Sequence, residues 1–418
     1  MSKQILVVGG GAAGMAAAWA AAKAGASVTL LEKNEKLGKK VYITGKGRCN
    51  VTNACPPEDL IRNVMSNPRF LYSAFRQFSN EALMTLLEEN GCPLKTERGQ
   101  RVFPVSDHAS DVTRTFERLL KQYGVRILLN HAVQNLEIEK EEIRGAWVRP
   151  KDALTPEFFP CGALILSTGG LSYPSTGSTG DGHRMAGQCG HELVSCLPSL
   201  VPLTTAEEWP KTLSGLTLKN AEASLWNGEA LLGKEFGELL FTHFGISGPT
   251  VLTLSSRFGR EIASSLNPIV RLDLKPALDR ETLDRRLQKE VREHPKQFLQ
   301  TILQELLPKA LIPVILQCAG TDGKRFGADL QKEERLRLAD AMKALTLHVS
   351  GTGGFSEAIV TKGGVSVKDV SPSTMESKRV HGLYFAGELL DVDALTGGFN
   401  LQIAWSTGVL AGKQAAKE

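Results

Sequence analysis

Cysteine is sparse and unpatterned in this chain of 418 residues. The seven cysteines are odd in number and scattered in spacing, and none forms a C-x-x-C pair. This argues against a disulfide framework, a zinc site and a thioredoxin-like pair. No apolar run reaches the roughly 18 residues that a membrane-spanning helix needs. The N-terminus also lacks the pattern of a secretory signal. We therefore expect a cytoplasmic protein with no membrane segment and no resident metal.

The bulk composition excludes further classes of protein. Apolar residues make up 42% of the chain and charged residues 22%, as in globular enzymes rather than disordered or fibrous proteins. The net charge of +4 is too small to prove an anionic partner and does not exclude one. The sequence contains neither internal repeats nor a low-complexity tract. A chain of this length predicts about two or three domains.

A glycine-rich turn lies near the N-terminus, between an apolar strand and an alanine-rich helix over residues 12–24. Gly9, Gly11 and Gly14 form a G-x-G-x-x-G pattern, and Glu32 ends the next apolar strand. In this pattern the glycines permit a tight turn, close approach of a pyrophosphate and packing of the helix on the strand, while the acid binds a ribose. A glycine turn in another α/β fold would not require the acid. We therefore predict that a dinucleotide binds here, with its phosphates at the helix N-terminus.

Two later segments indicate that the dinucleotide is FAD. The apolar strand over residues 163–167 ends in Thr168, Gly169 and Gly170, where flavoproteins of the glutathione-reductase type carry an Ala-Thr-Gly stretch. Asp181 then stands where it is expected to cap the next helix. Alone, each segment is equally well explained as a glycine turn between a strand and a helix. Their order along the chain makes the assignment specific.

The C-terminal part carries the remaining flavoprotein features. An apolar strand over residues 383–386 leads to Gly387, and either Glu388 or Asp391 corresponds to the acid that follows such a strand in flavoproteins. A glycine loop then leads into a helix whose N-terminus is predicted to face the N1–C2=O edge of the flavin. The predicted cofactor contacts in this loop are Gly397, Gly398, Phe399, Asn400 and Leu401.

A basic, glycine-punctuated segment over residues 33–53 has two interpretations. It is either a solvated loop with one or two contacts to the pyrophosphate, or a surface that receives RNA phosphates. The candidate cofactor contacts within it are Lys33, Lys40, Thr44, Gly47, Arg48 and Asn50. Ala13, in the first helix, and Val133, in a predicted β-meander over residues 132–149, complete the predicted contacts with the cofactor.

The predicted fold is α/β, with one nucleotide domain assembled from both ends of the chain. Residues 1–195 and 346–418 are expected to form this FAD-binding domain. A composition shift near residue 195 introduces short alternating strands, which predict an inserted β-rich domain over residues 196–275. Helical periodicity then predicts an inserted helical segment over residues 276–345.

From end to end, the chain resembles the HI0933-like, or BaiN-like, family of NAD(P)/FAD-dependent oxidoreductases. The resemblance is carried by residues 9–14, 44–53, 241–249, 387–391 and 396–401. The second and third of these segments are absent from generic flavoproteins. The resemblance implies a glutathione-reductase-type, Rossmann-like FAD domain with an inserted domain, and it implies a reductase.

The resemblance leaves the substrate open. Some members are similar to enzymes that make dihydrouridine in 23S ribosomal RNA, and others are associated with reduction of steroid-like bile acid intermediates. The leading expectation is reduction of a uridine in 23S rRNA or its precursor. The alternatives are a small conjugated substrate and a non-catalytic flavin scaffold or redox sensor. Residues 196–345 show no RNA-binding signature such as clustered aromatics on a basic sheet.

The electron donor is expected to be NADPH or NADH, bound transiently over the flavin. No second G-x-G-x-x-G occurs, so a dedicated NAD(P)H domain is not expected. A redox disulfide between Cys49 and Cys55 is not expected either, because their spacing differs from the C-x-x-x-x-C of disulfide reductases.

Two residues are candidate catalytic groups. Cys49, next to Lys46 and Arg48, would have a lowered thiol pKa and would act on the reduced double bond as proton donor, or else it packs against the cofactor. His243 would serve as acid or substrate contact if the insertion covers the flavin, or else it hydrogen-bonds its own turn. Tyr173 is a weaker candidate, and a surface position on a helix is expected for His183.

Overall fold

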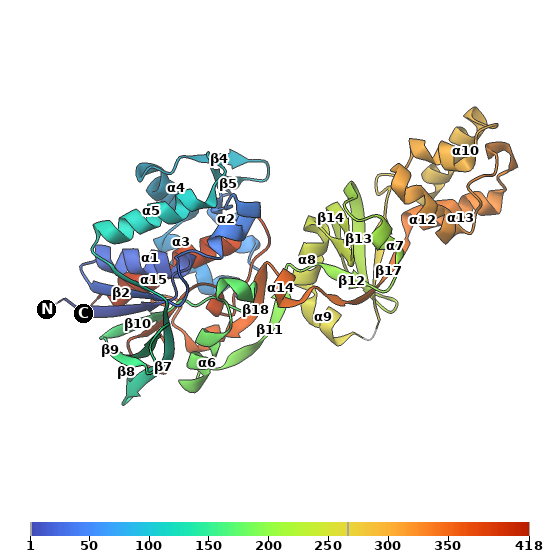
Figure 1. Ribbon diagram of the computed structural model, residues 1–418. Helices are drawn as coiled ribbons and strands as arrows, with labels where there is room; N and C mark the ends of the chain where they lie inside the picture. The colour runs from blue at the N-terminus through green and yellow to red at the C-terminus, as the bar shows by residue number, and fades with distance from the viewer. Residues whose placement is uncertain (1, 266, 418) are drawn as a thin grey trace. The chain divides into compact units, whose positions relative to one another are not determined.

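The computed structural model describes residues 2–265 and 267–417, which fold as two compact units. The terminal unit runs up to Ser199 and resumes at Phe355, and the inserted unit is Leu200–Gly354 (Figure 1). The insertion therefore begins four residues later than the predicted 196 and ends nine residues later than the predicted 345. Its end lies later because the strand Leu345–Thr352 pairs within the inserted unit.

The terminal unit is built on a five-stranded parallel sheet of order β19-β10-β1-β2-β6. Its strands are β1 (Gln4–Val8), β2 (Ser27–Glu32), β6 (Arg126–Leu129), β10 (Ala163–Leu166) and β19 (Leu383–Phe385). The inner strands are almost wholly apolar and buried, as expected of a parallel sheet covered on both faces. This confirms the predicted α/β fold.

Two helices of this unit cross at very short range. Helix α1 (Ala12–Lys23) packs against α15 (Phe399–Ala415), and nearly every residue of α1 is buried, which accounts for its alanine-rich sequence. A Cβ added at Gly408 would overlap the carbonyl of Ala13, so the crossing requires glycine there. The first and last helices of the unit are thereby joined.

The remaining elements of the terminal unit surround this core. Its other helices are α2 (Pro57–Arg62), α3 (Tyr72–Gln77), α4 (Asn80–Glu89), α5 (Ala109–Gln122) and α6 (Asp181–Gln188). A small sheet is formed, in spatial order, by β3 (Thr52–Asn53), β5 (Arg101–Pro104) and β4 (Leu94–Glu97). The predicted meander is the sheet of β7 (His131–Glu139), β8 (Glu142–Pro150) and β9 (Glu157–Pro160). Strands β11 (Leu193–Ser199) and β18 (Val360–Val365) form an antiparallel pair.

The inserted unit is a closed antiparallel barrel with helices attached (Figure 1). Its strands are β12 (Leu203–Thr205), β13 (Thr217–Asn227), β14 (Ala230–Thr242), β15 (Gly245–Ser247), β16 (Pro268–Asp273) and β17 (Leu345–Thr352). Its helices are α7 (Trp209–Thr212), α8 (Pro249–Arg257), α9 (Gly259–Ser264), α10 (Arg280–Glu293), α11 (Leu299–Ile302), α12 (Ile312–Ala319) and α13 (Lys332–Lys343). Helix α14 (Gly354–Glu357) follows β17.

The helical segment of the insertion is inseparable from the barrel. Helices α10 to α13 lie in the chain between β16 and β17, and their apolar side chains join the barrel residues in one continuous core. Within the described residues, no helix is long and apolar enough to cross a membrane.

Candidate functional site

The glycine turn after β1 has the geometry that a dinucleotide requires. Gly9 has a φ of 100°, and a Cβ there would come within 2.6 Å of the carbonyl oxygen of Ser167. A Cβ at Gly14 would overlap the carbonyl of Gly9, so this glycine permits the close packing of helix and strand. Among the described residues, nothing approaches within 4 Å of a Cβ built at Gly11, the N-cap of α1. The helix N-terminus is therefore accessible to a phosphate.

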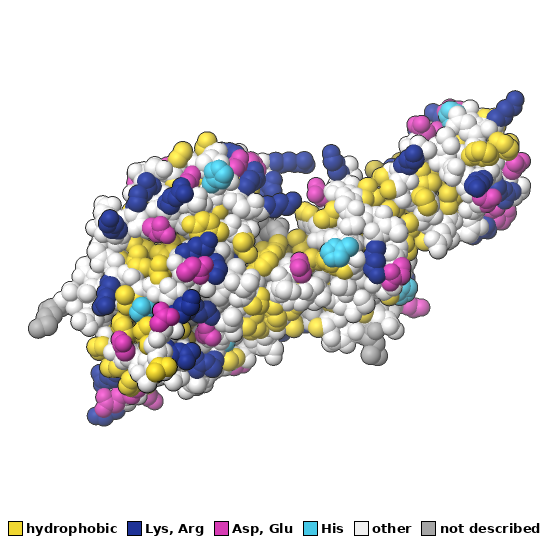
Figure 2. Space-filling view, viewed as in Figure 1, with side chains coloured by type: hydrophobic (Ala, Val, Ile, Leu, Met, Phe, Trp, Pro, Cys, Tyr) yellow, Lys and Arg dark blue, Asp and Glu magenta, His cyan; other side chains and the backbone are white. Residues whose placement is uncertain are grey.

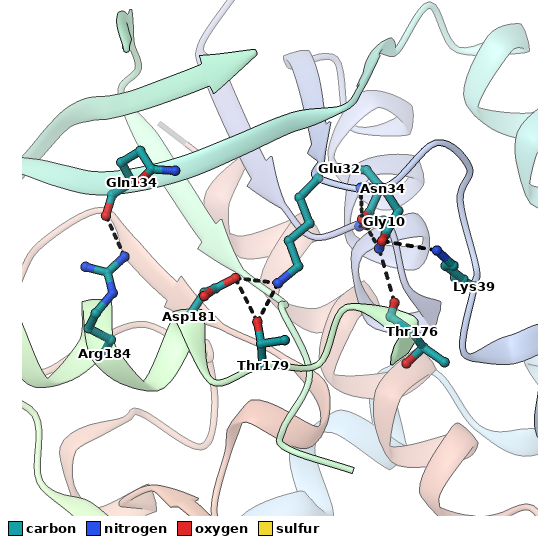
Figure 3. A network of polar contacts seen from close by, with 10 residues as sticks. Gly10, Glu32, Asn34, Lys39, Gln134, Thr176, Thr179, Asp181 and Arg184 are labelled. Carbon is teal, nitrogen blue, oxygen red and sulfur yellow. Dashed lines mark hydrogen bonds and ion pairs between the residues drawn. The ribbon is translucent and has the colours of Figure 1, made fainter. Parts of the chain in front are cut away.

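Glu32 is fixed beside this turn by hydrogen bonds (Figure 3). Its Oε2 accepts the N–H of Gly10 at 2.6 Å, and its Oε1 accepts the backbone and side-chain N–H groups of Asn34 at 2.8 and 2.7 Å. The carboxylate is buried, yet a carboxylate carries about four lone-pair sites. It can therefore still accept a hydrogen bond from a ribose hydroxyl, so the residues present fit the predicted role.

Lys33 and Asp181 bind each other rather than presenting free charges. The Lys33 ammonium lies 2.5 Å from Asp181 and 2.6 Å from the hydroxyl of Thr179. Figure 3 shows Asp181 and Thr179 beside one another at the start of α6. The expectation that Asp181 caps α6 is wrong, because Gly180 is the N-cap and Asp181 is the first helical residue. The pair instead connects the end of β2 with α6.

The Thr-Gly-Gly stretch after β10 leaves a polar atom for a ligand. The hydroxyl of Thr168 is buried and has no hydrogen-bond partner among the described residues. Gly169 has a φ of 74°, and a Cβ at Gly170 would overlap the hydroxyl of Thr361. Because buried polar groups are normally satisfied, the orphaned hydroxyl beside the glycine turn is consistent with a bound cofactor.

Glu388 links three segments of the terminal unit. Its carboxylate accepts the Ser172 hydroxyl at 2.6 Å and the Thr361 N–H at 2.8 Å, and its other oxygen lies 2.7 Å from the Lys40 ammonium. Burial alone would raise the pKa of Glu388, but the charge of Lys40 and these hydrogen bonds lower it below its ordinary value. The second candidate acid, Asp391, accepts a hydrogen bond from Asn67 at 3.0 Å. The predicted contacts Lys40 and Glu388 are thus brought together. Gly387, directly before Glu388, has a φ of 75°. The partners Ser172 and Thr361, which are distant in the sequence, were not predicted.

The segment over residues 44–53 has an unusual backbone. Four of its residues lie in the left-handed region, namely Gly45, Lys46, Gly47 and Cys49, with φ between 56° and 86°. For residues with side chains this conformation costs about 1 kcal/mol or more. The side-chain oxygen of Asn50 is buried and without a partner among the described residues, whereas the hydroxyl of Thr44 donates to the carbonyl of Val41 at 2.7 Å. The strain and the unsatisfied oxygen occur together, as at ligand sites.

This segment contacts the N-terminus of α15. The side chain of Asn53 donates to the carbonyl of Gly397 at 3.0 Å, and a Cβ at Gly398 would overlap the backbone of Thr52. Gly398 is the N-cap of α15, and no side chain caps this end of the helix. Asn400 closes its own loop by donating to and accepting from the backbone of Ala394, and its neighbours Phe399 and Leu401 begin the helix. The structure therefore brings together two motifs that are far apart in the sequence.

Arg48 is held by two acids that sequence reasoning missed. Its guanidinium forms two hydrogen bonds with Glu97, at 2.9 and 3.0 Å, and lies 3.3 Å from Asp107. It also lies over the ring of Phe103, with its central carbon 4.0 Å from the ring centroid. The hydrogen bond with Glu97 raises the pKa of Arg48. The two acids thus neutralise the charge of Arg48. The sequence does not show this pairing, because the acids lie 49 and 59 residues further along the chain.

The prediction of a lowered thiol pKa for Cys49 is wrong. Cys49 is fully buried, and burial raises its pKa to about 12. The charge of Arg48 is directed to Glu97 and Asp107, while Lys46 is exposed to solvent. The thiol therefore keeps its proton at neutral pH. Both Cys49 and Cys55 are free thiols in this structure.

His243 lies in the inserted unit, exposed in the turn between β14 and β15. Its ring packs edge-on against Phe244, with centroids 4.7 Å apart. In the same segment, a Cβ at Gly245 would overlap the carbonyl of Leu203, and one at Gly248 would lie 2.9 Å from the N–H of Leu240. The glycines of this family-specific segment thus close the barrel. The catalytic role of His243 stays a prediction.

Three further residues that the sequence analysis singled out lie in the terminal unit. Val133 is buried in β7 opposite Val148. Tyr173 has a φ of 50°, and its N–H donates to the carbonyl of Phe355 at 2.9 Å. The expectation of a surface position for His183 is wrong: it is buried, with Nε2 3.2 Å from the carbonyl oxygen of Leu389, and burial lowers its pKa. His183 lies on the face of α6 toward β18, where a Cβ added at Gly364 would come within 3.1 Å of its Nε2.

Known proteins resemble this chain over almost its whole length. The family model described as the HI0933-like protein Rossmann domain matches residues 3–414. The chain is 34% identical to a ribosomal RNA dihydrouridine synthase of Haemophilus influenzae, over 96% of both chains. It is 32% identical to a 3-dehydro-bile acid delta(4,6)-reductase of Clostridium scindens, over 99% of both chains.

A solved structure supports the fold. The 3-ketosteroid-delta4-(5alpha)-dehydrogenase of Rhodococcus jostii aligns over 100% of this chain and 97% of its own, with a TM-score of 0.56 and 15% identity. The glycine turn, the placement of Glu32 and the orphaned Thr168 hydroxyl fit FAD, and the family match extends over nearly the whole chain. The chain therefore belongs to the HI0933-like family of FAD-dependent oxidoreductases.

Proposed function

We propose that this protein takes electrons from NADPH or NADH and reduces a carbon–carbon double bond conjugated with a carbonyl group. The observation that carries the proposal is the junction of the strained segment 44–53 with the uncapped N-terminus of α15. Backbone strain of this kind persists where a fold holds residues for a function. A scaffold that only stores FAD would not require it.

The chain's own residues account for binding and orientation of the cofactor. When bound, FAD supplies hydride transfer. The N-terminus of α1 and the open side of Gly11 would receive the pyrophosphate, and Glu32 would hold a ribose. The N–H groups at the start of α15 would stabilise negative charge on the ring system.

The proton that completes the reduction needs a donor in the protein or solvent. Cys49 retains its proton at neutral pH, but a thiol with a pKa of about 12 is a weak acid. His243, exposed in its turn, is the other candidate. Substitution of each, followed by measurement of product formation after flavin reduction, would separate the two.

A uridine of 23S rRNA, or of its precursor, is our leading substrate. The C5=C6 bond of uracil is conjugated with a carbonyl, and two relatives, in Haemophilus influenzae and Escherichia coli, are named ribosomal RNA dihydrouridine synthases. A small steroid-like enone is the second candidate, which the equally extensive likeness to the bile acid reductase supports. On the face seen in Figure 2, Lys and Arg side chains of the terminal unit are interspersed with Asp and Glu. Within the basic segment 33–53, ion pairs with acids are formed by Lys33, Lys39, Lys40 and Arg48, so the segment provides no separate support for RNA.

Two experiments test the proposal. Anaerobic mixing of the FAD-loaded protein with NADPH or NADH should bleach the flavin absorbance, and a flavin that stays oxidised with both would contradict the nicotinamide donor. Comparison of dihydrouridine in ribosomal RNA from cells with and without the gene then tests the substrate. Unchanged dihydrouridine would remove the rRNA candidate and direct the search to conjugated small molecules.

A further inference from the structure

Two phenylalanines in the helical part of the inserted unit stack on each other at the surface. The ring centroids of Phe298 and Phe326 lie 5.0 Å apart, with an angle of 17° between the ring planes. The two side chains are 42% and 45% exposed. An ordered, solvent-facing pair of rings offers flat apolar surface to a partner.

The backbone holds this pair rigidly. Phe298 and Phe326 face each other in an antiparallel bridge between two loops. The N–H of Leu299 donates to the carbonyl of Arg325 at 2.8 Å, and the N–H of Gly327 donates to the carbonyl of Gln297 at 2.9 Å. Such a preordered surface loses little conformational entropy when a ligand binds.

Positive charge flanks the rings. Each phenylalanine follows an exposed lysine by two residues, Lys296 before Phe298 and Lys324 before Phe326. In the described part of the chain, neither lysine forms an ion pair. The acid nearest to Lys324 in the sequence, Asp322, accepts the backbone N–H of Lys324 at 2.9 Å, and Glu293, the acid nearest to Lys296, pairs with Lys289. Two exposed ammonium groups without an ion pair among the described residues thus lie two residues along the chain from the stacked rings.

A second exposed aromatic pair has acidic neighbours rather than basic ones. Trp147 and Phe158, in the β7–β9 meander, have centroids 5.3 Å apart and are 38% and 41% exposed. Here the indole N–H donates to Glu137 at 2.9 Å, and Glu157 directly precedes Phe158. Acidic neighbours repel phosphates, so this pair serves as a matched control for the first.

We propose that Phe298, Phe326, Lys296 and Lys324 form a contact site for single-stranded RNA, which we name the phenylalanine platform. Bases stack on the rings, and phosphates bind the lysines, as in sequence-tolerant single-strand recognition. The inference rests on the rRNA substrate of the proposed function. The 27 residues between the two phenylalanines conceal the platform in the sequence, which is why no aromatic cluster was predicted there.

Fluorescence anisotropy with a labelled oligouridylate of about 12 nucleotides tests the rings, using the full-length protein loaded with FAD. The double variant Phe298→Ala/Phe326→Ala should bind about tenfold more weakly or worse, because loss of base stacking has an effect of this size. The variant Phe298→Tyr/Phe326→Tyr should bind like the parent protein, since tyrosine also stacks. Phe158→Ala should leave binding unchanged. Equal melting temperature and FAD content verify that each variant is folded.

Salt dependence tests the lysines separately. The variant Lys296→Ala/Lys324→Ala should lower the slope of log Kd against log salt by about 1.4, because each phosphate contact to a single strand contributes about 0.7. The alanine variant of the two phenylalanines should keep the parental slope. A slope that the lysine variant leaves unchanged would contradict the assignment of phosphates to these residues.

Several outcomes would overturn the platform: no binding of the oligonucleotide by the parent protein, parental binding by the alanine variants, or an equal loss in Phe158→Ala. Loss of self-association in the variants, with RNA binding unchanged, would also overturn it and identify an interface between copies. Failure of the proposed substrate gives a different result. In that case ribosomal RNA keeps its dihydrouridine without the gene, while the protein still binds RNA through Phe298 and Phe326.

Discussion

The two family-specific segments achieve unusual backbone conformations in different ways. In residues 241–249 the left-handed positions are Gly245 and Gly248, which adopt these angles without a Cβ penalty. In residues 44–53 they include Lys46 and Cys49, which do carry a Cβ. The first segment closes a barrel with glycines, which adopt these angles without strain. The second holds strained residues where the cofactor motifs meet, which is the pattern expected of a functional site.

The two segments also differ in what holds them. Strand pairing secures the barrel segment, since β15 bonds to β12 on one side and β14 on the other. Side-chain contacts hold the strained segment: Arg48 forms an ion pair with Glu97, and the side chain of Asn53 donates to the carbonyl of Gly397. Substitutions should therefore unfold the first and disturb the activity of the second.

The largest effect is expected from Gly245→Ala. A Cβ there overlaps the carbonyl of Leu203, and the φ of 155° is unfavourable for alanine, so we expect a loss of about 3 kcal/mol in the free energy of unfolding. Urea unfolding, followed by tryptophan fluorescence, measures it. Gly228→Ala is the matched control, because Gly228 also has a positive φ but no neighbour within 4 Å among the described residues. Equal losses in both would refute the role of the overlap.

Arg48→Ala should lower turnover more than stability. Removal of the guanidinium releases the strained segment from Glu97 and Asp107 and from the face of Phe103, and we expect only a small loss of stability because solvent screens these ion pairs. Turnover should fall about tenfold, because misplacement of groups at a site has effects of that order or larger. Steady-state kinetics and thermal melting measure the two. Arg62→Ala, which removes only an exposed pair with Asp59, should change neither. Parental turnover in Arg48→Ala would count against a functional role of the segment.

Lys46→Gly should separate strain from function. Glycine relieves the left-handed conformation and should stabilise the protein by up to about 1 kcal/mol, while turnover falls if the held backbone serves the site. Lys140→Gly, in the turn between β7 and β8 with a φ of 53°, is the control that should gain similar stability and keep parental turnover. A stabilised Lys46→Gly with full turnover would show that the strain is incidental.

The smallest effect is expected from the thiol of Cys49. Because burial raises its pKa to about 12, the pH profile of flavin reduction between about pH 6 and 9 should be the same in Cys49→Ala as in the parent protein. In the native protein, Ellman's reagent should modify the exposed Cys318 and leave Cys49 intact. Rapid modification of Cys49 would show that the site opens in solution.

The contrast between the segments also explains which predictions succeeded. The α/β fold and the family follow from local patterns, because the spacing of Gly9 and Gly14 encodes a turn that only glycine permits. The environment of Cys49 does not follow from its neighbours in sequence. Proximity to Arg48 along the chain suggested a lowered pKa, whereas the fold buries the thiol and directs the guanidinium to Glu97.

By itself, the sequence determined the conformations that one short stretch of chain can adopt, including the glycine turns, the cofactor-binding strand and helix and the apolar strands of the sheet. Only the tertiary structure decided the pairs that join distant segments, such as Lys40 with Glu388 and Phe298 with Phe326. The physical reason is that backbone angles depend on local residue types, whereas burial, charge pairing and ring stacking depend on which segments the fold brings within contact distance.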